Sequence, residues 1–231
     1  NRPEREKLQI EENKKKIFNL ESIIESNIRS LVLIQSNIEE NRNMIMSNYS
    51  SALSINSDLA RKNTKNIFEN SFSLISKIIT HDENEEKHLE LEKDKVKLEY
   101  LNHQIELNEK KLNVLQKISE LNSELIKVNE DIMKMNQYIV DFNKKNIQSN
   151  KEMMKSDFNC PDVSSESLKE SEDFIIKKAD TLEKKIKKNQ EVAITLTKKT
   201  NANSTSIMKN RNIIHQRRES IMSNSESVEI N

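Results

Sequence analysis

Few residues of this chain have side chains that do chemistry, and they are scattered. The four histidines are His81, His88, His103 and His215, and the single cysteine is Cys160. His81 and His88 are seven residues apart beside acidic side chains, so a ring of identical chains could bring them around a metal ion. Solvated histidines at a helix junction explain the same spacing. We expect no metal site, and we expect Cys160 to be a free surface thiol.

No grouping of residues points to catalysis. The chain has 231 residues and no Gly, so it lacks the residue on which phosphate-binding loops and nucleotide-binding turns depend. Only 34% of the residues are hydrophobic and 4% are aromatic, whereas 33% are charged. This composition is typical of a long helical rod and not of an enzyme with a large core. The sequence predicts a non-enzymatic protein with no cofactor and no small-molecule substrate.

Helix-breaking residues divide the chain into three predicted helices. Pro161 lies in a short stretch of turn-forming residues, and Asp82 followed by Glu85 is typical of a helix start. We expect helical segments over 4–79, 82–155 and 165–224, a loop over 156–164 and a frayed tail over 225–231.

A seven-residue repeat runs through these segments and predicts an all-α coiled coil. In the first segment, position a holds Ile10, Ile17, Ile24, Leu31, Ile38, Ile45, Ala52 and Leu59. In the third segment, position a holds Ala179, Ile186, Ala193, Thr200, Ile207, Ile214 and Ile221. Position d, three residues later, mixes apolar residues with Asn.

Asparagine at position d is the most specific feature of the repeat. Of the 27 Ile residues that have a residue three positions later, 12 have Asn there. The alternative is an Asn-rich composition that decorates the helices at random. Asn in a seam lowers stability, but it penalises every register that does not align Asn with Asn. We therefore expect parallel chains in register, with these residues in the oligomer core: Asn13, Asn27, Asn41, Asn48, Asn108, Asn129, Asn136, Asn143, Asn150, Asn189, Asn210 and Asn224.

The middle segment has a second apolar stripe beside the first seam. It consists of Ile118, Leu121, Leu125, Val128, Ile132, Met135, Ile139 and Phe142. Two adjacent seams on one helix favour a core of three or more helices, so we predict a long parallel coiled coil, a homotrimer, with local bundle packing. The register also slips near Leu59 and near His81. Such slips change the supercoil locally, and a chain that folds back at residue 80 is the rival explanation.

The repeated Ile-x-x-Asn pattern resembles the stalks of trimeric coiled-coil fibres. It is similar to bacteriophage neck whiskers (fibritin) and to trimeric autotransporter adhesin stalks, through residues such as Asn27, Asn41 and Asn189. The resemblance implies a rigid trimeric spacer of a virion or surface appendage, with an attachment protein at one or both ends. The alternative function is an intracellular, cytoplasmic tether that scaffolds protein partners. A SNARE-like role is disfavoured because Gln216 falls at position c.

Charge is unevenly distributed along a chain whose net charge is zero. Residues 184–218 carry a net charge of +9, and residues 157–183 carry a net charge of −5. The basic block predicts a docking surface for an acidic partner, through Lys184, Lys185, Lys187, Lys188, Lys198, Lys199, Arg211, Arg217 and Arg218. The alternatives are a solvated face and pairing with the acidic block.

Two features bear on the source of the chain. It begins at Asn1, so we expect a processed or excised piece of a longer protein. No apolar run approaches the length of about 18 residues that a membrane-spanning helix needs, so no such segment is expected.

Overall fold

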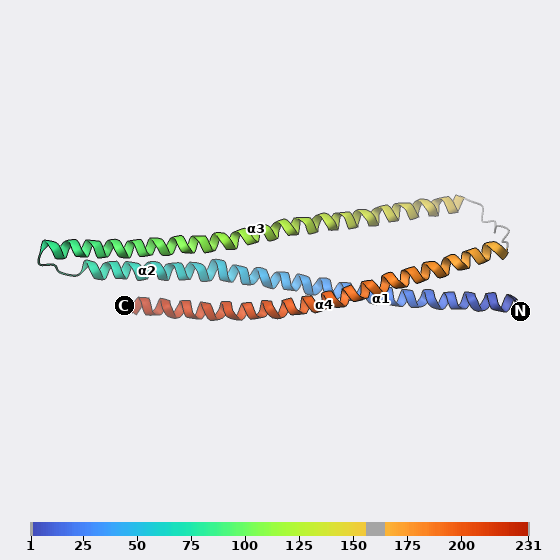
Figure 1. Ribbon diagram of the computed structural model, residues 1–231, viewed down its shortest axis with the longest axis horizontal. Coiled ribbons are helices and arrows are strands. Elements are labelled where there is room, and N and C mark those ends of the chain that lie inside the picture. The colour runs from blue at the N-terminus through green and yellow to red at the C-terminus, as the bar shows by residue number, and fades with distance from the viewer. Residues whose placement is uncertain (1, 156–164, 231) are drawn as a thin grey trace. The chain divides into compact units, whose positions relative to one another are not determined.

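The computed structural model describes residues 2–155 and 165–230, and within these ranges it is all-α and contains no strand. Its elements are α1 (Arg2–Tyr49), the π-helix η1 (Ser50–Asn56), α2 (Ser57–Ser76), α3 (Glu83–Lys155) and α4 (Ser165–Ile230) (Figure 1). The predicted all-α class is confirmed. The loop predicted over 156–164 lies outside the described residues.

The chain divides into two compact units. The first comprises Asn1–Asn66 and Asp162–Asn231, and the second comprises Ile67–Pro161. In the first unit, α1 and α4 lie side by side (Figure 1). The two helices are parallel, because contacts between them join residues whose numbers differ by a nearly constant 158 to 159.

Position d of α1 packs on position a of α4. Leu20 is buried against Ala179 and Ile186, and Ile34 further along α1 is only 3% exposed. On α4, the a residues from Ala179 to Ile207 are all buried, including Thr200 at 3% exposure. Each helix therefore buries one heptad column against the other. The a column of α1 stays 42–57% exposed between Ile10 and Ile45.

The π-helix η1 accounts for the register slip predicted near Leu59. The donors Asn48 and Asn56 are eight residues apart, whereas the residues of α4 that they contact, Ile207 and Ile214, are seven apart. A π-helical segment widens the turn and so accommodates one extra residue within a helix. The slip expected from sequence is thus confined to Ser50–Asn56, and the pairing with α4 continues beyond it.

The second unit contains a reversal of the chain between α2 and α3. Asp82 caps α3 by accepting hydrogen bonds from the backbone N–H groups of Asn84 (2.8 Å) and Glu85 (2.9 Å). The Glu85 carboxylate in turn accepts from the backbone N–H of His81 (2.8 Å), so the predicted helix start is confirmed.

Aromatic contacts hold the two sides of this reversal together. The rings of Phe68 and Tyr100 are 5.2 Å apart, and the Lys93 ammonium lies 5.9 Å from the centre of the Phe72 ring. Because rising numbers on α2 meet falling numbers on α3, the two helices are antiparallel. The alternative of a chain that folds back near residue 80 is therefore the arrangement observed.

Two helix ends differ from the predicted ones by more than two residues. The first helical stretch ends at Ser76 and not at 79, and α4 continues to Ile230 where a frayed tail was expected after 224. Half-buried Val228 is seven residues beyond Ile221 and continues the a column of α4. The last residues therefore keep a packing position, which favours a continued helix.

Candidate functional site

Four asparagines join the parallel helices of the first unit, and we name them the asparagine ladder. Each side-chain Nδ2 donates a hydrogen bond to a backbone carbonyl of α4. The donor and acceptor pairs are Asn41 with Thr200, Asn48 with Ile207 and Asn56 with Ile214, each at 3.0 Å, and Asn63 with Ile221 at 2.7 Å.

The ladder satisfies buried amides without disturbing either helix. A carbonyl oxygen has two lone pairs, so it accepts the Asn amide in addition to its own helical N–H. Asn41, Asn56 and Asn63 are only 6–7% exposed, and at that depth an unpaired amide would be costly. The acceptors recur every seven residues on α4, so the ladder fixes the helices in the axial position that places each amide beside its carbonyl.

Arg218 adds a charged group to the ladder at the end of the π-helix. Its Nε donates to Oδ1 of Asn56 at 3.1 Å, so the Asn56 amide both donates and accepts across the interface. The Nη2 atom of Arg218 is buried and has no hydrogen-bond partner among the described residues. Arg218 therefore serves the pairing of helices and differs from the remaining residues of the basic block.

The asparagines predicted for an oligomer core lie in two kinds of environment. Asn13, Asn27, Asn41 and Asn48 are buried or half-buried on the side of α1 that faces α4, and the last two belong to the ladder. Those on α3 and α4 are exposed: Asn108, Asn129, Asn136, Asn143, Asn150, Asn189, Asn210 and Asn224.

Three asparagines with the same spacing were not among those predicted for the oligomer core. Asn56 and Asn63 belong to the ladder, but the extra residue of the π-helix moves them out of the heptad count that starts at Ile10. Asn122 lies seven residues before Asn129 and was left out because the polar Ser119, and not an apolar residue, precedes it by three. A search for Asn at intervals of seven or eight residues, with no apolar residue required three positions earlier, finds all three.

A shallow groove runs beside the ladder where columns a of α1 and d of α4 are uncovered. Its volume is about 370 Å³, and its walls are Ile45, Asn48, Tyr49, Ala52, Ile207, Asn210, Ile213 and Ile214. The exposed sides of Ile45 (47%) and Ile213 (42%) make it apolar. The groove is a surface on which the side chains of a further helix can pack.

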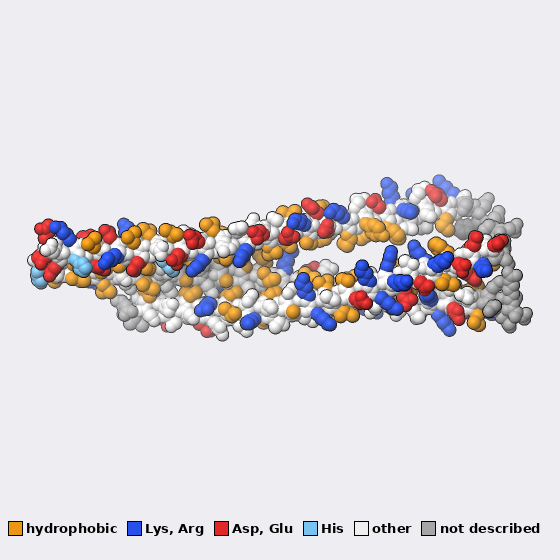
Figure 2. Space-filling model, in the orientation of Figure 1, with side chains coloured by type: hydrophobic (Ala, Val, Ile, Leu, Met, Phe, Trp, Pro, Cys, Tyr) orange, Lys and Arg blue, Asp and Glu red, His pale blue; other side chains and the backbone are white. Residues whose placement is uncertain are grey.

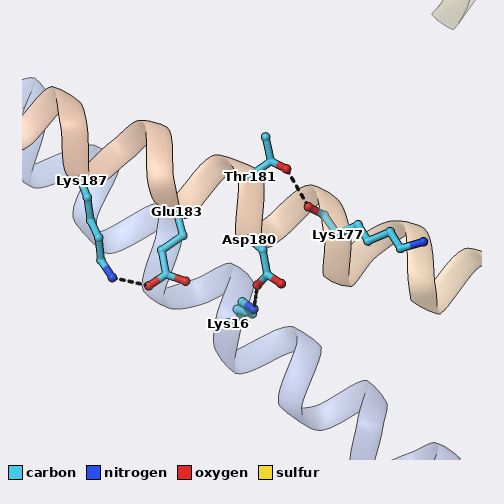
Figure 3. Close-up of polar contacts among 6 residues, drawn as sticks. All are labelled: Lys16, Lys177, Asp180, Thr181, Glu183 and Lys187. Atoms are coloured by element: carbon cyan, nitrogen blue, oxygen red, sulfur yellow. Dashed lines mark hydrogen bonds and ion pairs between the residues drawn. The ribbon is translucent and has the colours of Figure 1, made fainter.

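The basic block lies on the exposed faces of α4. Lys184, Lys185, Lys187, Lys188, Lys198, Lys199, Arg211 and Arg217 are exposed, and Arg218 is half-buried. Lys187 pairs with Glu183 on its own helix at 2.8 Å. Asp180 of α4, which precedes the block in the sequence, forms an ion pair with Lys16 of α1 (Figure 3). The acidic end of the 157–183 segment therefore contacts α1 in addition to neighbouring lysines.

The Glu183 carboxylate has a shifted titration. The hydrogen bond that Lys187 donates, together with the charge of that ammonium, lowers the pKa of Glu183 below its ordinary value. The same hydrogen bond raises the pKa of Lys187. Both groups lie at the surface, with the side chain of Lys187 63% exposed and that of Glu183 39% exposed, so the pair contributes little to stability.

The apolar face of α3 is uncovered along its C-terminal half. Side chains of the predicted stripe, such as Leu121, Ile132 and Phe142, are 45–57% exposed. The neighbouring a column is equally open, with Ile126 at 59% and Val140 at 57%. Figure 2 shows hydrophobic side chains at the surface along this half of the helix.

The described residues contain no group of three or more His, Cys, Asp or Glu side chains placed to hold a metal ion. Within the same residues, no helix combines the length and the apolar character needed to cross a membrane. No family of known proteins, no curated protein and no solved structure matches the chain. The class that the fold defines is an all-α protein of long helices, two of which are paired in parallel by an asparagine ladder.

Proposed function

We propose that the chain is a non-enzymatic structural rod that assembles through its helices with further copies of itself. The observation that carries the proposal is the set of long uncovered apolar columns. Columns of Ile and Leu that are about half-exposed lie along α1 and α3, and in water such columns favour association with other helices.

The groove beside the ladder supports a three-helix arrangement. The a column of α1 and the d column of α4 lie on the same open side, and in a parallel three-helix coiled coil both columns face the third helix. We therefore propose a parallel homotrimer. The proposed role is that of a spacer in a virion or surface fibre, held by an attachment protein at one or both ends, as the resemblance to fibre stalks implies.

A second function is favoured by the basic block. Its lysines and arginines are mostly exposed on one helix, and a high local density of positive charge attracts an acidic partner. On this proposal the chain is an intracellular tether that scaffolds an acidic protein along 184–218. Neither proposal includes a cofactor, a metal ion or a small-molecule substrate.

The mass of the assembly tests the first proposal. Sedimentation equilibrium of the purified 27.0 kDa chain should give about three times the monomer mass at micromolar concentration. A monomer across the accessible concentrations would overturn the proposal. Binding of an acidic protein by a chain that stays monomeric would favour the scaffold.

A further inference from the structure

The α3 helix carries a column of asparagines with the spacing of the ladder. Asn122, Asn129, Asn136, Asn143 and Asn150 follow one another at intervals of seven residues. All five are exposed. In the first unit, asparagines at this spacing donate to the carbonyls of a parallel helix.

This column lies in the middle of an apolar face. On one side is the a column with Ile126, Met133, Val140 and Ile147, and on the other is the stripe from Leu121 to Phe142. A helix that covers the face therefore buries the asparagines together with their apolar neighbours. Buried amides need hydrogen-bond partners, so the covering helix must supply acceptors at the same interval.

The ladder of the first unit shows which helix can do so. Its donors are asparagines at position d of α1 and at the continuation of that column on η1 and α2. Its acceptors are the carbonyls of the a column of α4, which is rich in Ile. The α3 helix has both parts, because its d column carries Asn and its a column carries Ile, Met and Val. An identical parallel helix in register is therefore a matching acceptor.

We propose that α3 self-associates in parallel with α3 of two further copies of the chain, through a second asparagine ladder. Its neighbour in the second unit, α2, is antiparallel to it and cannot supply a parallel ladder. Donation from the d column of one helix to the a column of the next is directional, and such contacts close into a ring. Three helices form the ring, each donating to the next. This inference rests on the proposed homo-oligomer and names the segment and the bond that form it.

A pair of matched substitutions tests the ladder. Asn136→Asp removes the Nδ2 donor and brings three carboxylates together, so it should raise the dissociation constant of the trimer by about tenfold or more. Asn113→Asp adds the same charge at an exposed position of α3 outside the column and should change it by less than about twofold. Circular dichroism checks that both variants remain helical.

Cysteine cross-linking tests the direction and register. In a chain with Cys160 replaced by Ser, single cysteines at Ile126 and at Ile147 should each form a disulfide between copies under mild oxidation. Parallel helices in register place every residue beside its own copy, whereas antiparallel helices can do so at one position at most. Cross-linking at only one of the two sites would overturn the parallel arrangement.

The outcomes separate the two proposals. A monomeric wild-type chain would overturn both the homo-oligomer and the α3 ladder. A trimer that tolerates Asn136→Asp as well as Asn113→Asp and forms no disulfide at Ile126 or Ile147 would overturn the α3 ladder alone. The chain would then associate through another surface, such as the groove beside α1.

Discussion

At the scale of single residues, the asparagines of the first unit act as connectors between backbones. A column of Ile at these positions would bury more apolar surface, but it would pack similarly after a slip of the helices. Asn41 and its equivalents each need one carbonyl at one place on α4. They therefore exchange some hydrophobic stabilisation for a defined axial position.

Removing one amide of the ladder should lower stability more than removing an amide outside it. Asn41→Ala deletes a bond to Thr200, and Asn43→Ala changes an exposed residue of the same helix. Both substitutions gain similar helix propensity, so their difference isolates the interface. We expect Asn41→Ala to be less stable than Asn43→Ala by about 1 kcal/mol in urea unfolding followed by circular dichroism. Equal stabilities would show that the bond contributes nothing.

Titration of Glu183 reports the ion pair on α4. Because a hydrogen bond from Lys187 lowers its pKa, Lys187→Gln should raise that pKa toward the ordinary value. Lys188→Gln removes the same charge from an exposed neighbour and should move it less. NMR of the side-chain carboxyl carbon measures both. A depressed pKa favours the folded state above the ordinary carboxyl pKa, and this small contribution is lost on acidification. An unchanged pKa in Lys187→Gln would contradict the assigned cause.

At the scale of elements, the π-helix lets a seven-residue repeat continue past an extra residue. The donors on either side of it, Asn48 and Asn56, reach acceptors that are seven residues apart. Without the wider turn, Asn56 would be rotated by about 100° away from α4. The π-helix therefore maintains the pairing and is not a defect of α1.

Deleting one residue of the π-helix should be tolerated. Loss of Ser51 would restore an interval of seven between Asn48 and the next donor, so η1 should become α-helical with the ladder intact. Loss of Thr205 from α4 shortens the interval between the acceptors Thr200 and Ile207 from seven residues to six and should disrupt the ladder beyond Thr200. Thermal unfolding should show a melting temperature unchanged or raised for the first deletion and lowered by several degrees for the second. The reverse order would refute this role for η1.

The helices were predictable from sequence, but their partners were not. The absence of Gly, the scarcity of Pro, the Asp82 start and the heptads define helical segments by local rules. Which column of α1 meets which column of α4 depends on contacts between residues 159 apart, and no local rule describes these. The heptads predicted parallel pairing, yet a homotypic repeat does not distinguish another copy from another segment of the same chain. Asn56 was missed for the further reason that periodicity assumes an uninterrupted α-helix.

At the scale of the whole molecule, the zero net charge conceals a basic helix. Residues 184–218 include a single acidic residue, Glu191. Glu183, just outside this block, pairs with Lys187. Much of its positive charge is thus exposed to solvent on α4. The positive side chains of the block repel one another, and this repulsion opposes the pairing of α1 with α4.

Added salt should therefore stabilise the paired helices. The Debye length falls from about 10 Å at 0.1 M to about 3 Å at 1 M, which screens repulsion within the block. We expect the melting temperature to rise between these concentrations, and to rise less in the Lys198→Gln/Lys199→Gln variant. Differential scanning calorimetry measures both changes. A melting temperature that falls with salt would mean that the acidic 157–183 segment already neutralises the block.

The parallel course of α1 and α4 also determines how the first unit bears tension. A force that pulls the N-terminal end of α1 away from the C-terminal end of α4 acts along both helices and shears the ladder. The bonds of Asn41, Asn48, Asn56 and Asn63 then share the load and must yield together. A force that separates the two helices at one end instead breaks the bonds one after another. The unit is therefore mechanically anisotropic: it resists stretching along its length and yields to peeling.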